Sequence, residues 1–328
     1  MVKNSIKAIM LALMAIVLVS CAEDKADSDR SIQERILNAY LDSKDFKSKY
    51  PDAQITPSGI VILEQQPGFG DVIEKGNGAY FEYSTQSLSG EYINTTDENI
   101  AKQLGIYSNS KYYGPALFEI GYRNTYIGLE EVMTGMQEGG KVKFILPPWL
   151  TRTESEPKWG ESSNLIFDLE LKHVITSILK WEEDTMKAYA NLHYPGLDTL
   201  SSNFYFKKLD GDEKDTLESG SVKVYYIGRL LDGFVFDTNI KDTAKKYGIY
   251  DPENSYEPLE VVHRKDLDEM LKDNSLVTGF CMAIQEMGYN ETAFTMFGSK
   301  YGYDSDGKDP IGPYQSLIFW LQTLSKDE

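Results

Sequence analysis

Apolar residues follow two spacings along this chain. Short runs typical of strands, several with an apolar residue at every second position, predict a fold dominated by sheet. Two segments, Ile32–Phe46 and Trp181–Leu192, instead place apolar residues three or four apart, which predicts amphipathic helices. The combination predicts an α+β fold of mostly antiparallel sheet with short helices. The predicted strands are Gly59–Leu63, Ala79–Tyr83, Val142–Leu146, Leu165–Leu171, Phe204–Phe206, Val222–Ile227, Ala293–Phe297 and Leu317–Leu321.

This pattern occurs twice. Gly105-Ile106-Tyr107 reappears 143 residues later as Gly248-Ile249-Tyr250. The offset then grows to 151 and 152 residues, as one small insertion would produce. Self-similarity at a nearly constant offset indicates two copies of one domain. Further matching pairs are Gly90 with Gly233, Pro115 with Pro258, Gly128 with Gly279, Met136 with Met287, and Asn164–Phe167 with Ser316–Phe319.

The repeat predicts the organisation of the chain. We assign residues 51–175 to a first domain and residues 198–328 to a second. Each follows a helical segment, a lead-in over residues 30–50 and a linker over residues 176–197.

The N-terminus is typical of a targeting signal. Ala8–Val19 is an uncharged apolar run that as a helix would span roughly 18 Å, too short for the ~30 Å core of a bilayer. Residues 1–20 therefore indicate a signal peptide. Leu18–Cys21 resembles the lipobox of bacterial lipoproteins, which predicts lipidation of Cys21; the alternative is an ordinary secretory signal.

Residues 21–29 are small and acidic, as in a flexible tether. Acidic residues directly after a lipidated cysteine resemble surface-export signals of outer-membrane lipoproteins. We therefore expect an outer-membrane lipoprotein of a Gram-negative bacterium that faces either the periplasm or the cell surface.

Charge and metal-binding residue types exclude several functions. The 328 residues carry a net charge of −18; without the two lysines of residues 1–20, 31 basic residues stand against 51 acidic ones, giving −20. So acidic a surface repels nucleic acid.

After lipidation of Cys21, Cys281 is the remaining thiol, so no intramolecular disulfide can form. Three scattered histidines lack the spacing of a zinc site, and Asp304–Asp309 lacks that of a calcium loop, so we expect no metal or cofactor.

The second copy carries motifs of a known family. Val222–Asn239 reads VKVYYIGRLLDGFVFDTN, and Leu276–Phe280 (LVTGF) is followed by Met287. Ile311–Tyr314 and Leu317–Phe319 complete the set in the same order. These segments resemble the FK506-binding-protein (FKBP) family of peptidyl-prolyl cis-trans isomerases. The resemblance implies two tandem domains, each with an antiparallel sheet wrapped around a short helix, and rotation about Xaa-Pro bonds without a cofactor.

The resemblance also implies a pocket. Phe280 stands where the family has tryptophan, which keeps an apolar floor but loses the indole N–H. The tyrosine that caps the pocket is Tyr303 by counting from Met287, whereas the literal Tyr-Gly pair of the motif is Tyr301-Gly302. The predicted pocket residues are Tyr226, Phe236, Asp237, Leu259, Val261, Val277, Phe280, Tyr303 and Phe319.

Roles follow from the same resemblance. Apolar side chains, among them Phe236, would grip the proline ring; Tyr303 would donate a hydrogen bond to the carbonyl oxygen, and Asp237 would hold Tyr226. The partners would be Xaa-Pro segments of exported or unfolded proteins, and the oligomeric state stays open. Residues 263–274 (HRKDLDEMLKDN) predict a polar helix beside the pocket mouth.

The first copy has lost these residues. Ile93-Asn94 replaces Phe236-Asp237, Leu129 replaces the floor aromatic, and Arg152 replaces the capping tyrosine. We therefore expect activity in the second copy alone. The alternative for the whole chain is a non-catalytic binding or scaffold lipoprotein that engages a protein or a glycan.

Overall fold

The computed structural model describes residues 29–122, 125–197, 199–211 and 216–326. The predicted signal peptide, Cys21 and nearly all of the predicted tether lie outside the described residues. Among the helices of the described part, none combines the length and apolar character needed to span a bilayer.

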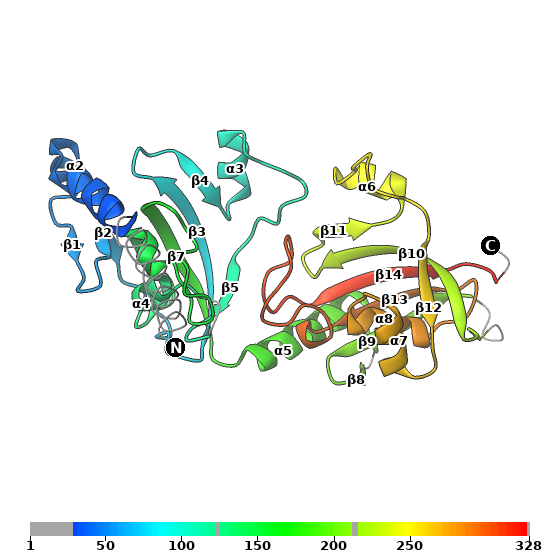
Figure 1. Ribbon diagram of the computed structural model, residues 1–328. Coiled ribbons are helices and arrows are strands. Elements are labelled where there is room, and N and C mark those ends of the chain that lie inside the picture. The colour runs from blue at the N-terminus through cyan, green and yellow to red at the C-terminus, as the bar shows by residue number, and fades with distance from the viewer. Residues whose placement is uncertain (1–28, 123–124, 198, 212–215, 327–328) are drawn as a thin grey trace, which may run out of the picture. The chain divides into compact units, whose positions relative to one another are not determined.

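The α+β prediction is confirmed: the chain forms two antiparallel sheets with short helices (Figure 1). The strand order is β1-β2-β6-β7-β3-β4 with β5 on β3 in the first sheet, and β8-β9-β13-β14-β10-β11 with β12 on β10 in the second. These are the same path with each strand number raised by seven, so both copies have one topology. The first sheet comprises β1 Gln54–Ile55, β2 Val61–Gln66, β3 Gly78–Ser87, β4 Tyr92–Thr95, β5 Ala116–Glu119, β6 Lys141–Leu146 and β7 Leu165–Ile175. The second comprises β8 Thr199–Ser201, β9 Phe204–Asp210, β10 Gly220–Leu230, β11 Val235–Thr238, β12 Leu259–His263, β13 Thr292–Phe297 and β14 Leu317–Thr323.

The helices repeat as well. Glycines at equivalent positions, Gly105 and Gly248, end α3 and α6 with the same left-handed backbone at φ 71°. That conformation is one that glycine adopts without steric cost. Besides a helix over residues 29–42, the helices are α2 Lys44–Lys49, α3 Glu98–Leu104, α4 Ile127–Met133, α5 Ile178–His193, α6 Lys241–Tyr247, α7 Leu267–Asp273 and α8 Thr278–Gln285.

Two predicted helices differ in extent. The helix expected over Ile32–Phe46 is interrupted at Ser43, whose hydroxyl accepts a hydrogen bond from the Phe46 amide at 3.1 Å and starts α2. The polar helix expected from His263 begins only at Leu267, because His263 still belongs to β12 and is 5% exposed. The spacing of apolar residues did not reveal that Ser43 caps a second helix or that His263 is the buried end of a strand.

The chain divides into two compact units. Unit 1 consists of the chain up to Val72, Tyr83–Asn94 and Gly121–Leu171. Unit 2 consists of Ile73–Glu82, Thr95–Ile120 and the chain from Lys172 onward. The domain boundaries expected from the repeat stay predictions.

The core of unit 2 lies on both faces of the second sheet. Along β13, Ala293 and Phe297 pack with Phe280 of α8, whereas Phe294 and Met296 between them pack with Met186 of α5. Successive strand residues point to opposite faces, so one alternating sequence serves both layers. The second sheet is therefore covered by α8 on one face and by α5 on the other.

Unit 1 repeats the packing of the helix that precedes each copy. Leu37 of the 29–42 helix and Phe46 of α2 pack against Ile145 on β6 and Ile166 on β7. The equivalent strand residues in unit 2, Met296 and Ile318, pack against α5. The repeating structural element is thus a sheet domain together with its preceding helix.

Candidate active site

A cavity of about 390 Å³ opens in unit 2. Its lining comes from β10, β11, β12, β14, α8 and the loop after β13. Eight of the nine predicted pocket residues line it; the ninth, Val261, is fully buried in the adjacent core. The eight are Tyr226, Phe236, Asp237, Leu259, Val277, Phe280, Tyr303 and Phe319.

Aromatic rings at right angles build the floor. Phe319 on β14 meets Phe280 of α8 edge to face, with centroids 5.2 Å apart at 88°. On another side Phe319 meets Phe236 of β11 at 5.7 Å and 81°. Such edge-to-face pairs are favourable because the positive ring edge meets the negative ring face. The floor is consequently apolar and held in one arrangement.

Two glycines permit this close packing. Gly228 on β10 lies opposite both Phe319 and Asp237, and a Cβ there would lie 2.6 Å from the Phe236 ring and 2.9 Å from Phe319. Gly279 in α8 faces the ring of Phe297 in the same way, because a Cβ on Gly279 would lie 2.3 Å from that ring. Small residues at these positions let the helix and strand backbones approach until the aromatic rings fill the space between them.

One hydrogen bond crosses the rim of the cavity. The Tyr226 hydroxyl donates to Oδ2 of Asp237 at 2.8 Å. The backbone beside it is held as well, because the Tyr226 amide donates to Asn239 and Thr238 donates to the Tyr226 carbonyl. Burial, and next the charge of Asp237, raise the pKa of Tyr226, so this hydroxyl stays a proton donor. An exposed carboxylate thus lies at the edge of a pocket with an aromatic floor.

The family model for FKBP-type peptidyl-prolyl cis-trans isomerases matches residues 85–172 and again residues 213–323. Together these ranges cover more than half of the 328 residues. The chain belongs to this family. Because the match occurs once in each copy, the predicted tandem arrangement of FKBP-like domains is confirmed.

The matches to individual proteins have low sequence identity. The chain is 24% identical over 155 residues to the FKBP-type isomerase FkpA of Buchnera aphidicola, a match that covers 47% of this chain and 58% of that protein. Among solved structures, an isomerase from Pseudomonas syringae is 25% identical, with a TM-score of 0.33, covering 45% of this chain and 92% of its own. FkpA from Escherichia coli is 22% identical, with a TM-score of 0.33, covering 52% and 71% respectively.

The structure distinguishes the two candidates for the capping tyrosine of the FKBP pocket. Tyr303 lines the cavity, and burial followed by the charge of Asp237 raises its pKa. Tyr301 instead packs against Phe204 in the core, edge to face at 6.3 Å. Tyr303 is therefore the tyrosine placed to reach a ligand in this cavity.

Sequence reasoning missed three lining residues. Ser275 and Leu276 precede α8 and line the wall next to Val277. Lys308 also lines the cavity, with its ammonium 5.5 Å from the centre of the Tyr303 ring. Leu276 was within a recognised motif, but nothing in the sequence indicated that the loop after Tyr303 returns Lys308 to the pocket.

The first copy keeps the geometry of the rim but not its charge. Asn94 donates through its side-chain amide to the Tyr83 hydroxyl at 3.2 Å, at the positions equivalent to Asp237 and Tyr226. Its neighbour Ile93 is 52% exposed. Leu129, in place of the floor aromatic, is buried. An amide and an aliphatic floor thus replace the carboxylate and the aromatic floor.

Neither a metal centre nor an activated thiol is found in the described part of the chain. No three histidine, cysteine, aspartate or glutamate side chains there are grouped so that they could hold a metal ion. Cys281 is buried in α8, and burial raises the pKa of its thiol to about 11, so it stays protonated. The groups available at this cavity are aromatic and aliphatic side chains, three hydroxyls, one carboxylate and one ammonium.

Proposed function

We propose that this protein is a peptidyl-prolyl cis-trans isomerase whose active site is the pocket of the second copy. The observation that carries the proposal is the hydrogen bond from Tyr226 to Asp237 at the rim of an aromatic cavity. The substrates would be Xaa-Pro segments of exported or unfolded polypeptides.

The chemistry needs no covalent step. A prolyl peptide bond is planar because of resonance, which places partial charges on its oxygen and nitrogen; twisting it removes that resonance. An aromatic pocket solvates polar groups less well than water does. It therefore disfavours the polar planar state more than it disfavours the less polar twisted state. Phe236, Phe280 and Phe319 would hold the proline ring in such surroundings. The difference in binding between the two states lowers the barrier.

The polar rim would act on the carbonyl group. The Tyr303 hydroxyl would donate a hydrogen bond to the substrate carbonyl oxygen. Tyr226 would hold the Asp237 carboxylate near the carbonyl carbon as the bond twists. Positioned donors and charges of this kind stabilise a transition state without reorganising during the reaction.

A matched pair of variants tests the proposal. In a chain without residues 1–21, acceleration of Xaa-Pro isomerisation in a tetrapeptide should disappear in Phe236→Ala. Ile93→Ala, at the equivalent position of the first copy, should leave the rate unchanged. Absence of activity on every Xaa-Pro peptide tested would overturn the proposal.

The first copy supports a second, non-catalytic function. Its rim holds the neutral Asn94 and its floor holds Leu129. We propose that this copy serves as a scaffold or binding domain. The rival for the whole protein is a binding module without catalysis, and the tetrapeptide assay separates the two.

We also propose that the protein is anchored in the outer membrane through lipidated Cys21. The support is the apolar run Ala8–Val19 followed by the lipobox-like Leu18–Cys21. Multiple acyl chains make such an anchor stable, whereas a single chain binds only marginally. A mature chain with a charge of −20 draws no help from anionic lipid.

A further inference from the structure

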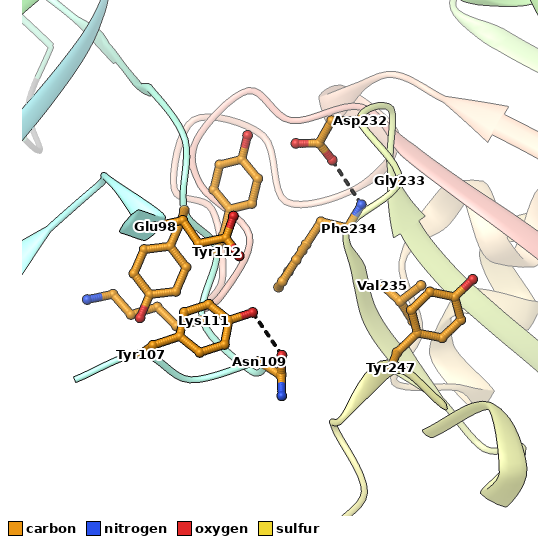
Figure 2. Close-up of a pocket in the computed structure, with 11 residues that line it drawn as sticks. Glu98, Tyr107, Asn109, Lys111, Tyr112, Asp232, Gly233, Phe234, Val235 and Tyr247 are labelled. Carbon is orange, nitrogen blue, oxygen red and sulfur yellow. Dashed lines mark hydrogen bonds between the residues drawn. The ribbon is translucent and has the colours of Figure 1, made fainter. Parts of the chain in front are cut away.

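A second cavity in unit 2, of about 340 Å³, lies outside the candidate active site. One wall is the loop after α3, with Tyr107, Asn109 and Tyr112, and the other includes the hairpin between β10 and β11 (Figure 2). Phe234 and Val235 line this cavity, whereas the next two residues of the chain line the candidate active site. The two cavities therefore share a strand but no lining residue.

A duplicated tyrosine pair shapes the loop. Tyr107 and Tyr113 stack with centroids 5.3 Å apart at 21°, and the Ser108 amide donates to the Tyr113 hydroxyl. In the second copy Tyr250 and Tyr256 stack in the same way, at 5.2 Å and 20°. The pair is thus a brace present in both copies, and it explains the loop conformation without any ligand.

Three residues on this brace belong to the first copy alone. Asn109, Lys111 and Tyr112 line the cavity, whereas the second copy has Pro252, Asn254 and Ser255 at these positions. The side chains that make the cavity are therefore additions to the shared brace.

The added residues are held in place by their contacts. Tyr112 meets Phe234 edge to face at 5.4 Å and 68°, and burial followed by the charge of Asp232 raises the pKa of Tyr112. Asn109 lies against Gly248, where a Cβ would come within 2.3 Å of its side-chain nitrogen. The Tyr107 hydroxyl donates to Asn109 at 2.8 Å. The cavity is consequently a preformed site.

Its chemistry suits an extended, proline-rich polypeptide. Rings of Tyr107, Tyr112 and Phe234 offer flat apolar surfaces, with Tyr247 on the far side 43% exposed. Polyproline II segments have no internal hydrogen bonds and keep their carbonyls available. Aromatic grooves bind such segments by stacking on proline rings while hydroxyl and amide groups donate to those carbonyls. The side-chain amide of Asn109 can supply such a donor.

Charge selects among such segments. Glu98 at the rim is paired with Lys102 at 2.6 Å. The other charged groups that line the cavity are the exposed carboxylate of Asp232 and the ammonium of Lys111, which lies 5.6 Å from the centre of the Tyr113 ring. The chain as a whole carries −18. Asp232 and Lys111 offset each other, so the net negative charge of the chain is what attracts a segment with lysine or arginine and repels an acidic one.

We propose that this cavity is a second polypeptide-binding site, which takes proline-rich segments bearing basic residues and performs no isomerisation. This proposal rests on the proposed function in one respect, namely that the protein acts on polypeptides that contain proline. A site of this kind would hold a client chain while the second-copy pocket acts on its prolyl bonds.

The test uses the chain from residue 22 carrying Phe236→Ala, which removes the aromatic grip of the other pocket. Fluorescence anisotropy is measured with labelled (Pro-Pro-Lys)3, (Ala-Ala-Lys)3 and (Pro-Pro-Glu)3. Only the first peptide should bind well. Tyr112→Ala should weaken binding at least tenfold, and Ser255→Ala, its counterpart in the second copy, should not. Asp232→Asn, which keeps the hydrogen bond to the Phe234 amide, should weaken it several-fold.

Equal binding of the proline and alanine peptides would overturn the proposal, as would full affinity in both a folded Tyr112→Ala variant and Asp232→Asn. Isomerisation of a tetrapeptide by the chain with Phe236 intact is measured separately and should be unaffected by Tyr112→Ala. Peptide binding without that activity would contradict the proposed function alone, and the reverse result would contradict the second site alone.

Discussion

The Tyr226 hydroxyl donates a hydrogen bond to Asp237 at 2.8 Å, whereas the hydroxyl of the equivalent Tyr83 in the first copy accepts a hydrogen bond from Asn94 at 3.2 Å. The two pairs occupy matching strands, so duplication preserved the geometry while the charge changed. In the second copy the tyrosine must donate because a carboxylate has only acceptors. The direction of this hydrogen bond is the clearest chemical difference between the two rims.

Replacing Asp237 with asparagine should make the second rim resemble the first. Loss of the negative charge beside the substrate carbonyl should lower kcat/KM for an Xaa-Pro peptide roughly tenfold or more, which corresponds to at least about 1.4 kcal/mol of transition-state stabilisation. Because Asp237 is exposed, the melting temperature should change little. Asn94→Asp is the matched control, and it should add no activity since Leu129 still replaces the floor aromatic.

The two neighbouring tyrosines should respond differently to loss of their hydroxyls. Tyr303→Phe should reduce kcat/KM because the hydroxyl beside the cavity is removed. Tyr301→Phe should leave kcat/KM near the parent value, since that ring packs on Phe204. An equal loss in both variants would contradict the assignment of Tyr303 as the cap.

Gly228→Ala should damage the pocket without adding a polar group. Its Cβ would enter the space of the Phe236 and Phe319 rings and displace them. We expect loss of isomerase activity and of stabilisation by a proline-mimicking macrolide, read as the shift in melting temperature. Gly233→Ala on the same hairpin tests strain alone, because its Cβ would meet nothing within 4 Å although its φ is 95°. Retention of macrolide binding in Gly228→Ala would contradict the packing argument.

Glu182 should make stability depend on pH. This side chain of α5 is 1% exposed and accepts hydrogen bonds from the Ser299 amide and hydroxyl and from the Ser316 hydroxyl. Burial raises its pKa above the usual 4.5. The folded state then holds this proton more tightly than the unfolded state does, so stability falls as pH rises from about 4.5 through the raised value.

The free energy of unfolding of the chain, measured with urea at several pH values, checks this prediction. Glu182→Gln removes the charge and keeps an acceptor, so its advantage over the parent should grow as pH rises through that window. Glu182→Ala leaves the buried Ser299 amide unsatisfied and should cost about 1–3 kcal/mol. A parent and a Gln variant with the same pH profile would show that the carboxyl titrates normally.

Cys21→Ser should release the protein from the outer-membrane fraction or leave its signal peptide uncleaved. The reason is that acylation of Cys21 is the proposed anchor and the acidic chain adds no attraction to anionic lipid. Membrane fractionation and the mass of the mature N-terminus provide the measurement. Normal processing with continued outer-membrane fractionation would exclude the lipid anchor.

The sequence by itself determined the duplication and the class of fold. Offsets of 143 to 152 residues imply two similar copies of one domain. Similar sequences bury the same alternating positions, as Ile145 of β6 and the equivalent Met296 of β13 do. The ordered motifs also predicted nine pocket residues, of which eight line the cavity, because each motif occupies a fixed place on the fold.

Only the tertiary structure decided which residues meet across long stretches of chain. Glu182 lies in the same helical stripe as Ile178, Met186 and Ala190, a spacing that reads as core, yet its partners Ser299 and Ser316 are more than a hundred residues away. The choice of Tyr303 over Tyr301 likewise depended on loop geometry. Periodicity reports which face of an element is buried, whereas hydrogen bonds and cavities depend on where distant segments place individual atoms.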